Sequence, residues 1–478
     1  MSLIKNTSIY AIGHILPKAA SFLLLPLYTR YLSPSDYGIV NSMMILLTLL
    51  TVFYSLSIER SIYRLYYDYQ TKEDKKNYLG TITITMVLNA FFVLLIVLLS
   101  KELISKIYST IPYNPYYLYI IGTGFFSIFG LIPKIYFQVE QKPLKFVLIS
   151  LSEFIVLTGL LIYFIVFRQM GAQGMLLAGL VASVIFLPLF IIVTFKIINF
   201  TFNYQTMKES LFFSIPLMPM IIAAWILNLS DRIFIENFNG LKEVGLYSIA
   251  YKLAEILLIF TAAFTKAYDP LFFKIANQED QIDAKIKLSL YNKMFAIILI
   301  ICALGITLFS KEFFMLLDKQ YFSAFNLVPI IMIGVLFSNV GGIFNLSMYQ
   351  AKNTKLIMFL TLASALLNII LNWLIVPIYG AQGAGFTTAI SFIFFFILKY
   401  YYSKKSYFLI FAWKELGIYF AIASICASFF YFFIYSFWIS LIIKSMVMLF
   451  FIAFVVLRNI KHIDFYFLKN LIFKVKRQ

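Results

Sequence analysis

The chain has 478 residues, of which 62% are hydrophobic and only 13% are charged, and its mean hydropathy is +0.90. Soluble domains are about 45–50% apolar and about 25% charged, so the composition excludes a soluble globular protein and predicts an integral membrane protein. The formal net charge of +18 does not indicate nucleic-acid binding, because no segment between the apolar runs is long enough to fold into a reading domain.

Apolar runs long enough to cross a bilayer as helices recur from one end of the chain to the other. A crossing takes about 18 or more residues, and these runs lack the strict alternation of a β-barrel strand. The sequence therefore predicts an all-α integral membrane protein with 14 transmembrane helices, near residues 8–30, 38–58, 80–99, 116–138, 146–167, 173–195, 211–230, 244–265, 291–309, 325–349, 356–376, 382–402, 416–435 and 438–457.

The positive charges indicate the orientation of the helices in the membrane. Most of the 39 Lys and Arg residues fall in loops on the same side as both termini. The positive-inside rule then places both termini in the cytoplasm, and the excess charge can also attract anionic lipid. We expect the first run to stay in the mature protein, because it is too long for a signal peptide, contains Lys18 and lacks a small-x-small cleavage site.

An internal repeat divides the chain. Four motifs recur in the same order about 210 residues later. They are SKEL at Ser100–Leu103 with SKEF at Ser310–Phe313, FQVEQKPLKF at Phe137–Phe146 with YQAKNTKLIM at Tyr349–Met358, GAQG at Gly171–Gly174 and again at Gly380–Gly383, and DYGIVNS around Gly38 with EVGLYS around Gly245.

The repeat predicts three regions. These are a six-helix bundle at residues 1–205, a second at 206–405, and two additional helices with a basic cytoplasmic tail at 406–478. Because six is even, both copies enter the membrane in the same sense. We therefore expect a pseudo-twofold axis along the membrane normal with a cavity between the bundles, an arrangement that suits alternating access.

Charged residues inside or next to the predicted spans indicate what this cavity holds. Lys18 lies on a polar stripe of the first span, and a Lys at mid-span costs about 2.5–3.5 kcal/mol unless it faces a bundle interior or a wet cavity. Basic residues outnumber acidic ones in the first, second, seventh and eighth spans, which fits an anionic cargo such as a phosphate or diphosphate. The predicted cation set is Lys18, Arg30, Arg60, Arg64, Arg232 and Lys252.

A second set of residues provides gating or ion-coupling candidates. Alternatives remain open for each, such as a structural carboxylate for Glu153 or mutual neutralisation of Lys252 and Glu255 at i, i+3. Pro216 and Pro219 should bend or interrupt the seventh span. The gating set is His14, Glu59, Glu153, Asp231 and Glu255.

The same sequence predicts neither a disulfide nor a metal site. Cys302 and Cys426 both lie in apolar runs, and no spacing typical of metal ligands accompanies them. We expect no bound cofactor beyond H⁺ or Na⁺ as an optional counter-ion.

The opening segment resembles a known family. A polar N-terminus, a span ending LPLYTRYLSPSDYGIV and a second span closing on IERSIYRLYY are similar to the polysaccharide transporters, the O-antigen and capsule repeat-unit flippases. These belong to the multidrug/oligosaccharidyl-lipid/polysaccharide (MOP) exporter superfamily. The FQ-x-E/K and GAQG segments also suit the family, so that the resemblance covers essentially the whole chain.

The resemblance implies a fold and a function. The fold is two six-helix bundles in a V-shape, and the function is translocation of undecaprenyl-diphosphate-linked oligosaccharide units across the bacterial cytoplasmic (inner) membrane for surface polysaccharide assembly. It implies membrane lipid and a polysaccharide polymerase as partners, and no nucleic acid. By position, Lys18, Arg30, Arg60 and Lys252 would meet the diphosphate and acidic sugars.

Two alternatives remain. A multidrug or cation exporter of the same superfamily would need a net negative cavity, which the charges oppose. A membrane enzyme acting on lipid-linked glycans would need a larger outer loop than the segment between Ser100 and Pro115, and no nucleophile–base pair or Gly-rich phosphate loop is visible. We therefore predict a transporter and not an enzyme.

Overall fold

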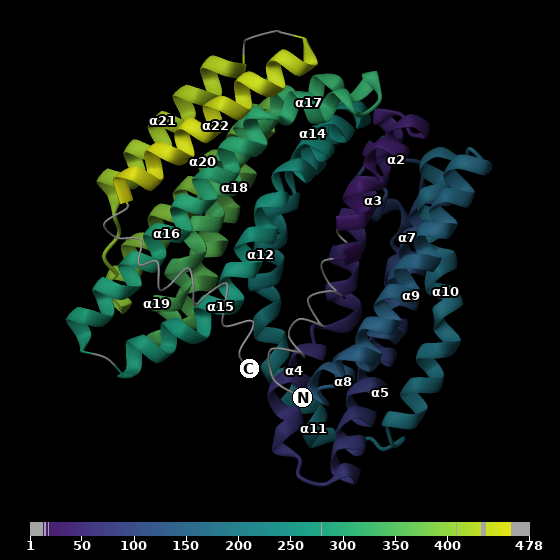
Figure 1. The fold of residues 1–478 in the computed structure, drawn as a ribbon. Coiled ribbons are helices and arrows are strands. Elements are labelled where there is room, and N and C mark those ends of the chain that lie inside the picture. The colour runs from purple at the N-terminus through teal and green to yellow at the C-terminus, as the bar shows by residue number, and fades with distance from the viewer. Residues whose placement is uncertain are drawn as a thin grey trace. The chain divides into compact units, whose positions relative to one another are not determined.

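A computed structural model describes residue 13 and the ranges 16–17, 19–278, 280–407, 409–431 and 436–459 (Figure 1). These residues form helices, turns and short connections, and no strand occurs among them. The expected all-α class is confirmed. The chain divides into two compact units, which we describe separately: the first runs to Ser248 and includes Thr361–Thr387, and the second combines Ile249–Leu360 with the residues from Thr388 onward.

The first unit contains the helices of the first sequence copy and the start of the second. Its first-copy elements are α2 (Leu25–Tyr31), α3 (Pro34–Ser55), α4 (Glu59–Leu65), η1 (Tyr66–Asp68), α5 (Lys72–Leu99), α6 (Lys101–Ile104), η2 (Tyr113–Tyr117), α7 (Leu118–Ser127), η3 (Ile128–Gly130), α8 (Leu131–Val139), α9 (Pro143–Ile162), η4 (Tyr163–Phe167) and α10 (Gly171–Ile197). They are followed by α11 (Tyr204–Ser214), η5 (Ile215–Leu217), α12 (Met218–Leu229), α13 (Asp231–Asn239) and α14 (Leu241–Ala254).

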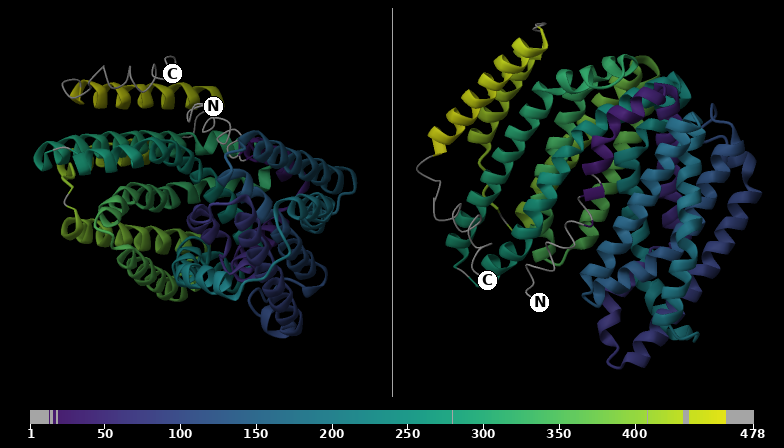
Figure 2. Two further views of the ribbon diagram at one scale, coloured as in Figure 1. Left: turned by 90° about the horizontal axis from the view of Figure 1, so that it is seen from below. Right: turned by 45° about the vertical axis from the view of Figure 1, so that its right-hand side comes forward.

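The second unit begins within α14. Its elements are α15 (Ile256–Gln278), α16 (Gln281–Leu308), α17 (Ser310–Met315), η6 (Lys319–Leu327), α18 (Val328–Val340), η7 (Gly341–Ile343), α19 (Phe344–Gln350), the two ends of α20 (Thr354–Ser406), α21 (Trp413–Tyr431) and α22 (Phe437–Asn459). Helices α21 and α22 both pack against α16, and they lie beside it in each view (Figures 1 and 2).

Local sequence signals start these helices. Ser33 and Asp36 form a capping box, in which the Asp36 backbone N–H donates to Ser33 Oγ and the Ser33 N–H donates to Asp36 Oδ2, both at 3.1 Å. Pro34 follows at the first helical position, where its missing N–H costs nothing. The capping box and this proline together explain why α3 begins inside the LSPSDYG segment.

Eleven described helical segments are long and apolar enough to cross a membrane. One of them is α20, in which Gly380 is non-helical and divides the helix into two lengths; α21 is a further apolar helix of 19 residues. The first predicted span, 8–30, lies partly outside the described residues. The predicted count of 14 is consistent with this set.

One expected loop is wrong. The predicted spans 244–265 and 291–309 leave residues Lys266–Leu290 as a loop between them, but α15 continues to Gln278 and α16 starts at Gln281. The charges of this region end the apolar pattern, yet Lys and Glu are good helix formers and do not end a helix. Hydropathy therefore located the edge of the membrane and not the end of the helix.

The turns in the repeated FQVEQKPLKF and YQAKNTKLIM motifs have the same backbone conformation. Gln141 and Lys352 both adopt left-handed conformations, with φ of 52° and 55°, directly before the helices that start at Pro143 and Thr354. In the same turns, the Lys142 N–H donates to Phe137 O at 2.8 Å and the Asn353 N–H donates to Met348 O at 2.9 Å. Phe137 thus corresponds to Met348, one residue away from the motif alignment, which paired it with Tyr349.

The two GAQG motifs also share a backbone conformation. Gly171 begins α10 with φ of 56°, and Gly380 interrupts α20 with φ of 53°. Only glycine adopts this left-handed conformation without a steric cost. The repeated glycine therefore starts an equivalent helix in each copy.

A close helix crossing joins the two copies inside the first unit. A Cβ added to Gly38 would lie 2.0 Å from Leu241 O, and a Cβ added to Gly245 would lie 1.8 Å from Pro34 O. In the repeat, Gly38 corresponds to Gly245 and Pro34 to Leu241, so each glycine meets the carbonyl of the other copy's equivalent residue. This is the reciprocal pattern of a twofold contact.

Candidate functional site

The predicted cations occupy different environments. Lys18 and His14 lie outside the described residues. Arg30 at the end of α2 and Arg60 in α4 are exposed, and within the described part of the chain no carboxylate lies at ion-pair distance from either. Arg64 pairs with Asp68 at 3.1 Å, but both side chains are more than half exposed, so the pair contributes little stability.

Arg232 lies in a buried ion pair. Its Nη1 is 2.8 Å from Asp231 Oδ1 and also donates to Asn228 O at 2.7 Å. Tyr247 on α14 donates its hydroxyl to Asp231 Oδ2 at 2.5 Å, and its ring lies under the guanidinium at 4.9 Å. The charges of Arg232 and Asp231 are therefore balanced by residues of the first unit.

Lys252 and Glu255 belong to the second unit. Lys252 is half-buried near the end of α14, and Glu255 is exposed at the junction with α15. Because they lie in a different unit from Arg30 and Arg60, the cationic cavity expected between the bundles stays a prediction.

The backbone between α3 and α4 is strained directly before Glu59, the first residue of α4. Leu56 and Ser57 have φ of 49° and 54°, a conformation that costs a non-glycine residue roughly 1–2 kcal/mol. The Ser57 N–H donates to Ser55 Oγ at 3.1 Å. After this break, Glu59 begins α4 half-buried, with Oε2 lacking a hydrogen-bond partner, and burial raises the pKa of its carboxyl.

Tyrosine side chains connect η1 to the end of α8. Tyr66 donates its hydroxyl to Glu140 Oε1 at 2.7 Å, and Tyr67 donates to Val139 O at 2.7 Å. Burial raises the pKa of the Glu140 carboxyl, but the Tyr66 hydrogen bond and Lys142 at 3.4 Å outweigh this and lower it overall. The sequence analysis missed this contact, although Glu140 stands inside the repeated FQVEQ motif.

Glu153 has a direct counter-charge. Its carboxylate lies 2.7 Å from Lys134 Nζ, and both side chains are about 30% exposed, at 28% and 30%. This ion pair with Lys134 supports the alternative that Glu153 is a structural carboxylate.

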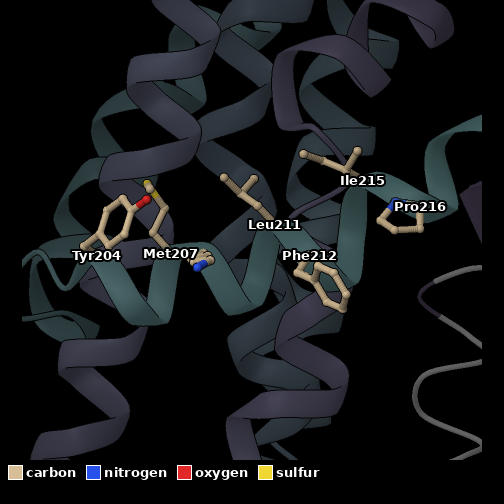
Figure 3. A pocket seen from close by; sticks show the side chains of 7 residues that line it. Tyr204, Met207, Leu211, Phe212, Ile215 and Pro216 are labelled. Atoms are coloured by element: carbon tan, nitrogen blue, oxygen red, sulfur yellow. The ribbon is translucent and has the colours of Figure 1, made fainter.

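The predicted break at Pro216 and Pro219 is confirmed. The 3₁₀ turn η5 separates α11 from α12 and contains Pro216, and Pro219 stands in the first turn of α12. Beside the break, α11 borders a shallow groove of about 360 Å³, shown in Figure 3. Its walls are mostly apolar, with Lys208 as a charged member.

Comparison with known proteins identifies the family. The sequence model of the family described as "Polysaccharide biosynthesis protein" matches residues 3–276, more than half of the chain. The chain belongs to this family. A second family model, MatE, matches residues 216–374.

Relatives of this polysaccharide biosynthesis family protein carry related names. The capsular polysaccharide biosynthesis protein CapF of Staphylococcus aureus is 25% identical over 433 residues, which cover 85% of this chain and 100% of CapF. The probable low-salt glycan biosynthesis flippase Agl15 of Haloferax volcanii is 26% identical over 190 residues, 39% of this chain and 40% of Agl15.

Solved structures confirm the fold of this family protein. The lipid II flippase MurJ in an inward closed conformation aligns with a TM-score of 0.75 and 17% identity, covering 94% of this chain and 99% of MurJ. An outward-facing multidrug resistance MATE transporter of the MOP superfamily aligns at 0.51 and 15% identity, covering 87% of this chain and 96% of that chain. The resemblance to the MOP superfamily is confirmed.

In this family protein, buried polar side chains connect Ser230, the residue that follows α12, with both halves of α20. Asn372 donates to Asn368 Oδ1 at 3.0 Å, Thr387 donates to Asn372, and Ser230 donates to Asn368 at 3.5 Å. All four side chains are less than 5% exposed. Such bonds between helices are typical of membrane bundles.

Among the described residues, no group of three His, Cys, Asp or Glu side chains lies close enough together to hold a metal ion. Cys302 and Cys426 are both free thiols.

Proposed function

We propose that this protein is a flippase that moves undecaprenyl-diphosphate-linked oligosaccharide units from the inner to the outer leaflet of the bacterial cytoplasmic membrane by alternating access. The family match over residues 3–276 carries the proposal. A fold aligned with MurJ over 94% of the chain, built from two sequence copies, supports the transport mechanism.

Two exposed arginines of the first unit are suited to bind the diphosphate. Arg30 and Arg60 are exposed at helix ends of the first unit and have no ion-pair partner among the described residues. A guanidinium presents paired N–H donors that match phosphate oxygens. The break at Leu56 and Ser57 re-aims the chain just before Arg60. Lys18 and Lys252 complete the proposed set.

The membrane potential assists this transport. A negative interior favours outward movement of an anion by roughly 2.3 kcal/mol per charge at 100 mV. The diphosphate headgroup carries its negative charge through the protein while the polyprenyl tail remains in lipid.

The experiment uses the full chain reconstituted into vesicles that contain a diphosphate-linked oligosaccharide lipid with a reducible fluorophore on its sugar. A membrane-impermeant reductant added outside bleaches the outer leaflet. We expect the protein to make the protected inner pool accessible, and Arg60→Ala to slow this flipping at least about tenfold, the loss of a charged phosphate contact worth about 1.4 kcal/mol.

Arg168→Ala is the matched control, because Arg168 is an exposed arginine at the end of η4. It should flip at the wild-type rate. If folded wild-type protein leaves the protected pool unchanged, the flippase proposal fails.

The MatE match over residues 216–374 supports a second candidate, export of organic cations. The same vesicles loaded with a fluorescent organic cation test it. Efflux of that cation together with no flipping of the labelled lipid would favour the exporter.

A further inference from the structure

One exposed face of α4 and η1 combines arginine with tyrosine. Four exposed residues follow the spacing i, i+3, i+4 and i+7, which places them along one side of a helix. They are Arg60, Tyr63, Arg64 and Tyr67. The segment directly follows the second predicted span, on the side that the positive charges predict to be cytoplasmic. We call these four residues the Arg–Tyr face.

The two exposed tyrosines are held in place by hydrogen bonds to α8. Tyr63 donates its hydroxyl to Gln138 Oε1, and Tyr67 donates to Val139 O at 2.7 Å. The rings nevertheless remain open to a ligand, because Tyr63 is 49% and Tyr67 54% exposed. The buried ring of Tyr66 packs edge-on against Tyr67, with centroids 5.7 Å apart. Two aromatic surfaces are therefore fixed in advance, which lowers the entropy cost of binding to them.

Arg60 supplies an available cation next to these rings. Among the described residues no carboxylate lies at ion-pair distance from Arg60, whereas Arg64 is paired with Asp68 at 3.1 Å. A guanidinium binds phosphate oxygens through paired N–H donors. On a helix, Cβ atoms three or four residues apart lie about 5–6 Å from each other, so Tyr63 is the aromatic neighbour of Arg60.

The second sequence copy does not repeat this face. After the contact between Gly38 and Gly245, the chain of the second copy continues into α15, which contains no arginine. The features that both copies share, such as the left-handed turns and the GAQG glycines, set the course of the backbone. The Arg–Tyr face occurs once and consists of exposed side chains, so the repeated fold does not require it.

We propose that Tyr63 and Tyr67 bind the first sugar of the transported lipid while Arg60 binds its diphosphate. This inference rests on the proposed function and names the part of the same substrate that the rings contact. The sugar is bonded directly to the distal phosphate, so a phosphate on Arg60 brings it to the ring one turn away. The C–H groups on the flat side of a pyranose carry partial positive charge and pack against the negative face of a tyrosine ring.

Binding is measured first without transport, with the full chain in detergent and two probes. One is a short-chain prenyl diphosphate that carries a single hexopyranose, and the other is the same prenyl diphosphate without the sugar. We expect calorimetric titration to show about tenfold tighter binding of the sugar-bearing probe, equivalent to about 1.4 kcal/mol. Tyr63→Leu should reduce this advantage to about twofold or less and leave the affinity for the sugar-free probe unchanged.

Further variants separate the ring from other contributions. Tyr63→Phe keeps the ring and loses only the bond to Gln138, so most of the sugar advantage should remain. Tyr163→Leu, at a tyrosine of η4 that is 48% exposed, is the matched control and should retain all of it. Arg60→Ala should weaken the binding of both probes. Tyr67→Leu repeats the test on the second ring, in case Tyr63→Leu impairs folding.

Two outcomes would overturn the sugar site. They are equal binding of both probes by the wild type, and equal weakening of both probes by Tyr63→Leu, which would make this tyrosine a membrane-interface anchor only. Flipping of the labelled lipid separates this result from the proposed function. If the sugar advantage depends on Tyr63 but the wild type flips no lipid, the sugar site stands and the flippase fails; if lipid is flipped without any sugar advantage, the reverse holds.

Discussion

Two buried glutamates, one in each unit, have opposite surroundings. Glu312 on α17 is 5% exposed, and Lys444 of α22 donates to its two oxygens at 2.7 and 2.8 Å. Ser440 adds a third bond at 2.5 Å. Glu236 on α13 is 1% exposed, yet only Oε1 is bonded and no cation pairs with it among the described residues.

The difference separates a fully bonded carboxylate from a partly bonded one. The Glu312 contact joins α17 to α22, one of the two helices without a counterpart in the repeat. A buried, fully bonded ion pair attaches this C-terminal helix to the bundle of the second unit. At Glu236, by contrast, only Oε1 has hydrogen-bond partners among the described residues.

Breaking the complete pair should have the largest effect. Lys444→Met leaves Glu312 buried without its cation, so we expect a loss of about 3–5 kcal/mol in the free energy of unfolding. Equilibrium unfolding in mixed micelles with a denaturing detergent measures it. The double variant Glu312→Gln/Lys444→Met removes both charges and should recover most of the loss; a double variant as unstable as the single one would contradict this account.

The ion pair beside Glu236 should respond less strongly. Arg232→Met removes a charged hydrogen bond to Asp231, but Asp231 keeps its bond from Tyr247, so we expect a loss of about 2–3 kcal/mol by the same measurement. Arg168→Met, at an exposed arginine, should change little. A loss as large as that of Lys444→Met would mean that Arg232 also balances Glu236.

Glu59 tests an intermediate case, because one of its oxygens lacks a partner and burial raises its pKa above the ordinary 4.5. The native state then holds its proton more tightly than the unfolded chain, so stability is highest below that ordinary value and falls as pH rises through the native pKa. Glu59→Gln should remove this dependence and stabilise the protein by about 1 kcal/mol at neutral pH.

Unfolding in mixed micelles at a series of pH values checks the Glu59 prediction. Glu73→Gln, at an exposed residue of the first turn of α5, is the control and should leave the curve unchanged. An unaltered pH profile in Glu59→Gln would show that Glu59 is not the group responsible.

The smallest effect is expected at Glu236. Glu236→Gln keeps an oxygen that can accept from Thr110 and replaces only the unbonded Oε2, so the free energy of unfolding should change by less than about 1 kcal/mol. A loss comparable to that of Lys444→Met would show that Oε2 has a stabilising partner, and the contrast between the two glutamates would disappear.

Hydropathy predicted most of the helices because each membrane-spanning helix must itself be apolar enough to lie in lipid. The break at Pro216 followed from the missing N–H of proline, and the repeat followed from motif order. The same reasoning placed Arg232 among substrate-binding cations, whereas the structure buries it against Asp231; the role predicted for it stays a prediction. Glu236 and Glu312 were not singled out, since both stand in polar segments between predicted spans.

The sequence by itself determined the membrane class, the approximate spans, the two copies and the likeness to polysaccharide flippases, because these depend on composition and on order along the chain. Only the tertiary structure decided which charges are balanced. The partners of Glu312 and Glu236 lie more than a hundred residues away, 132 positions for Lys444 and 126 for Thr110. Burial and pairing arise from packing between distant helices, which no local pattern records.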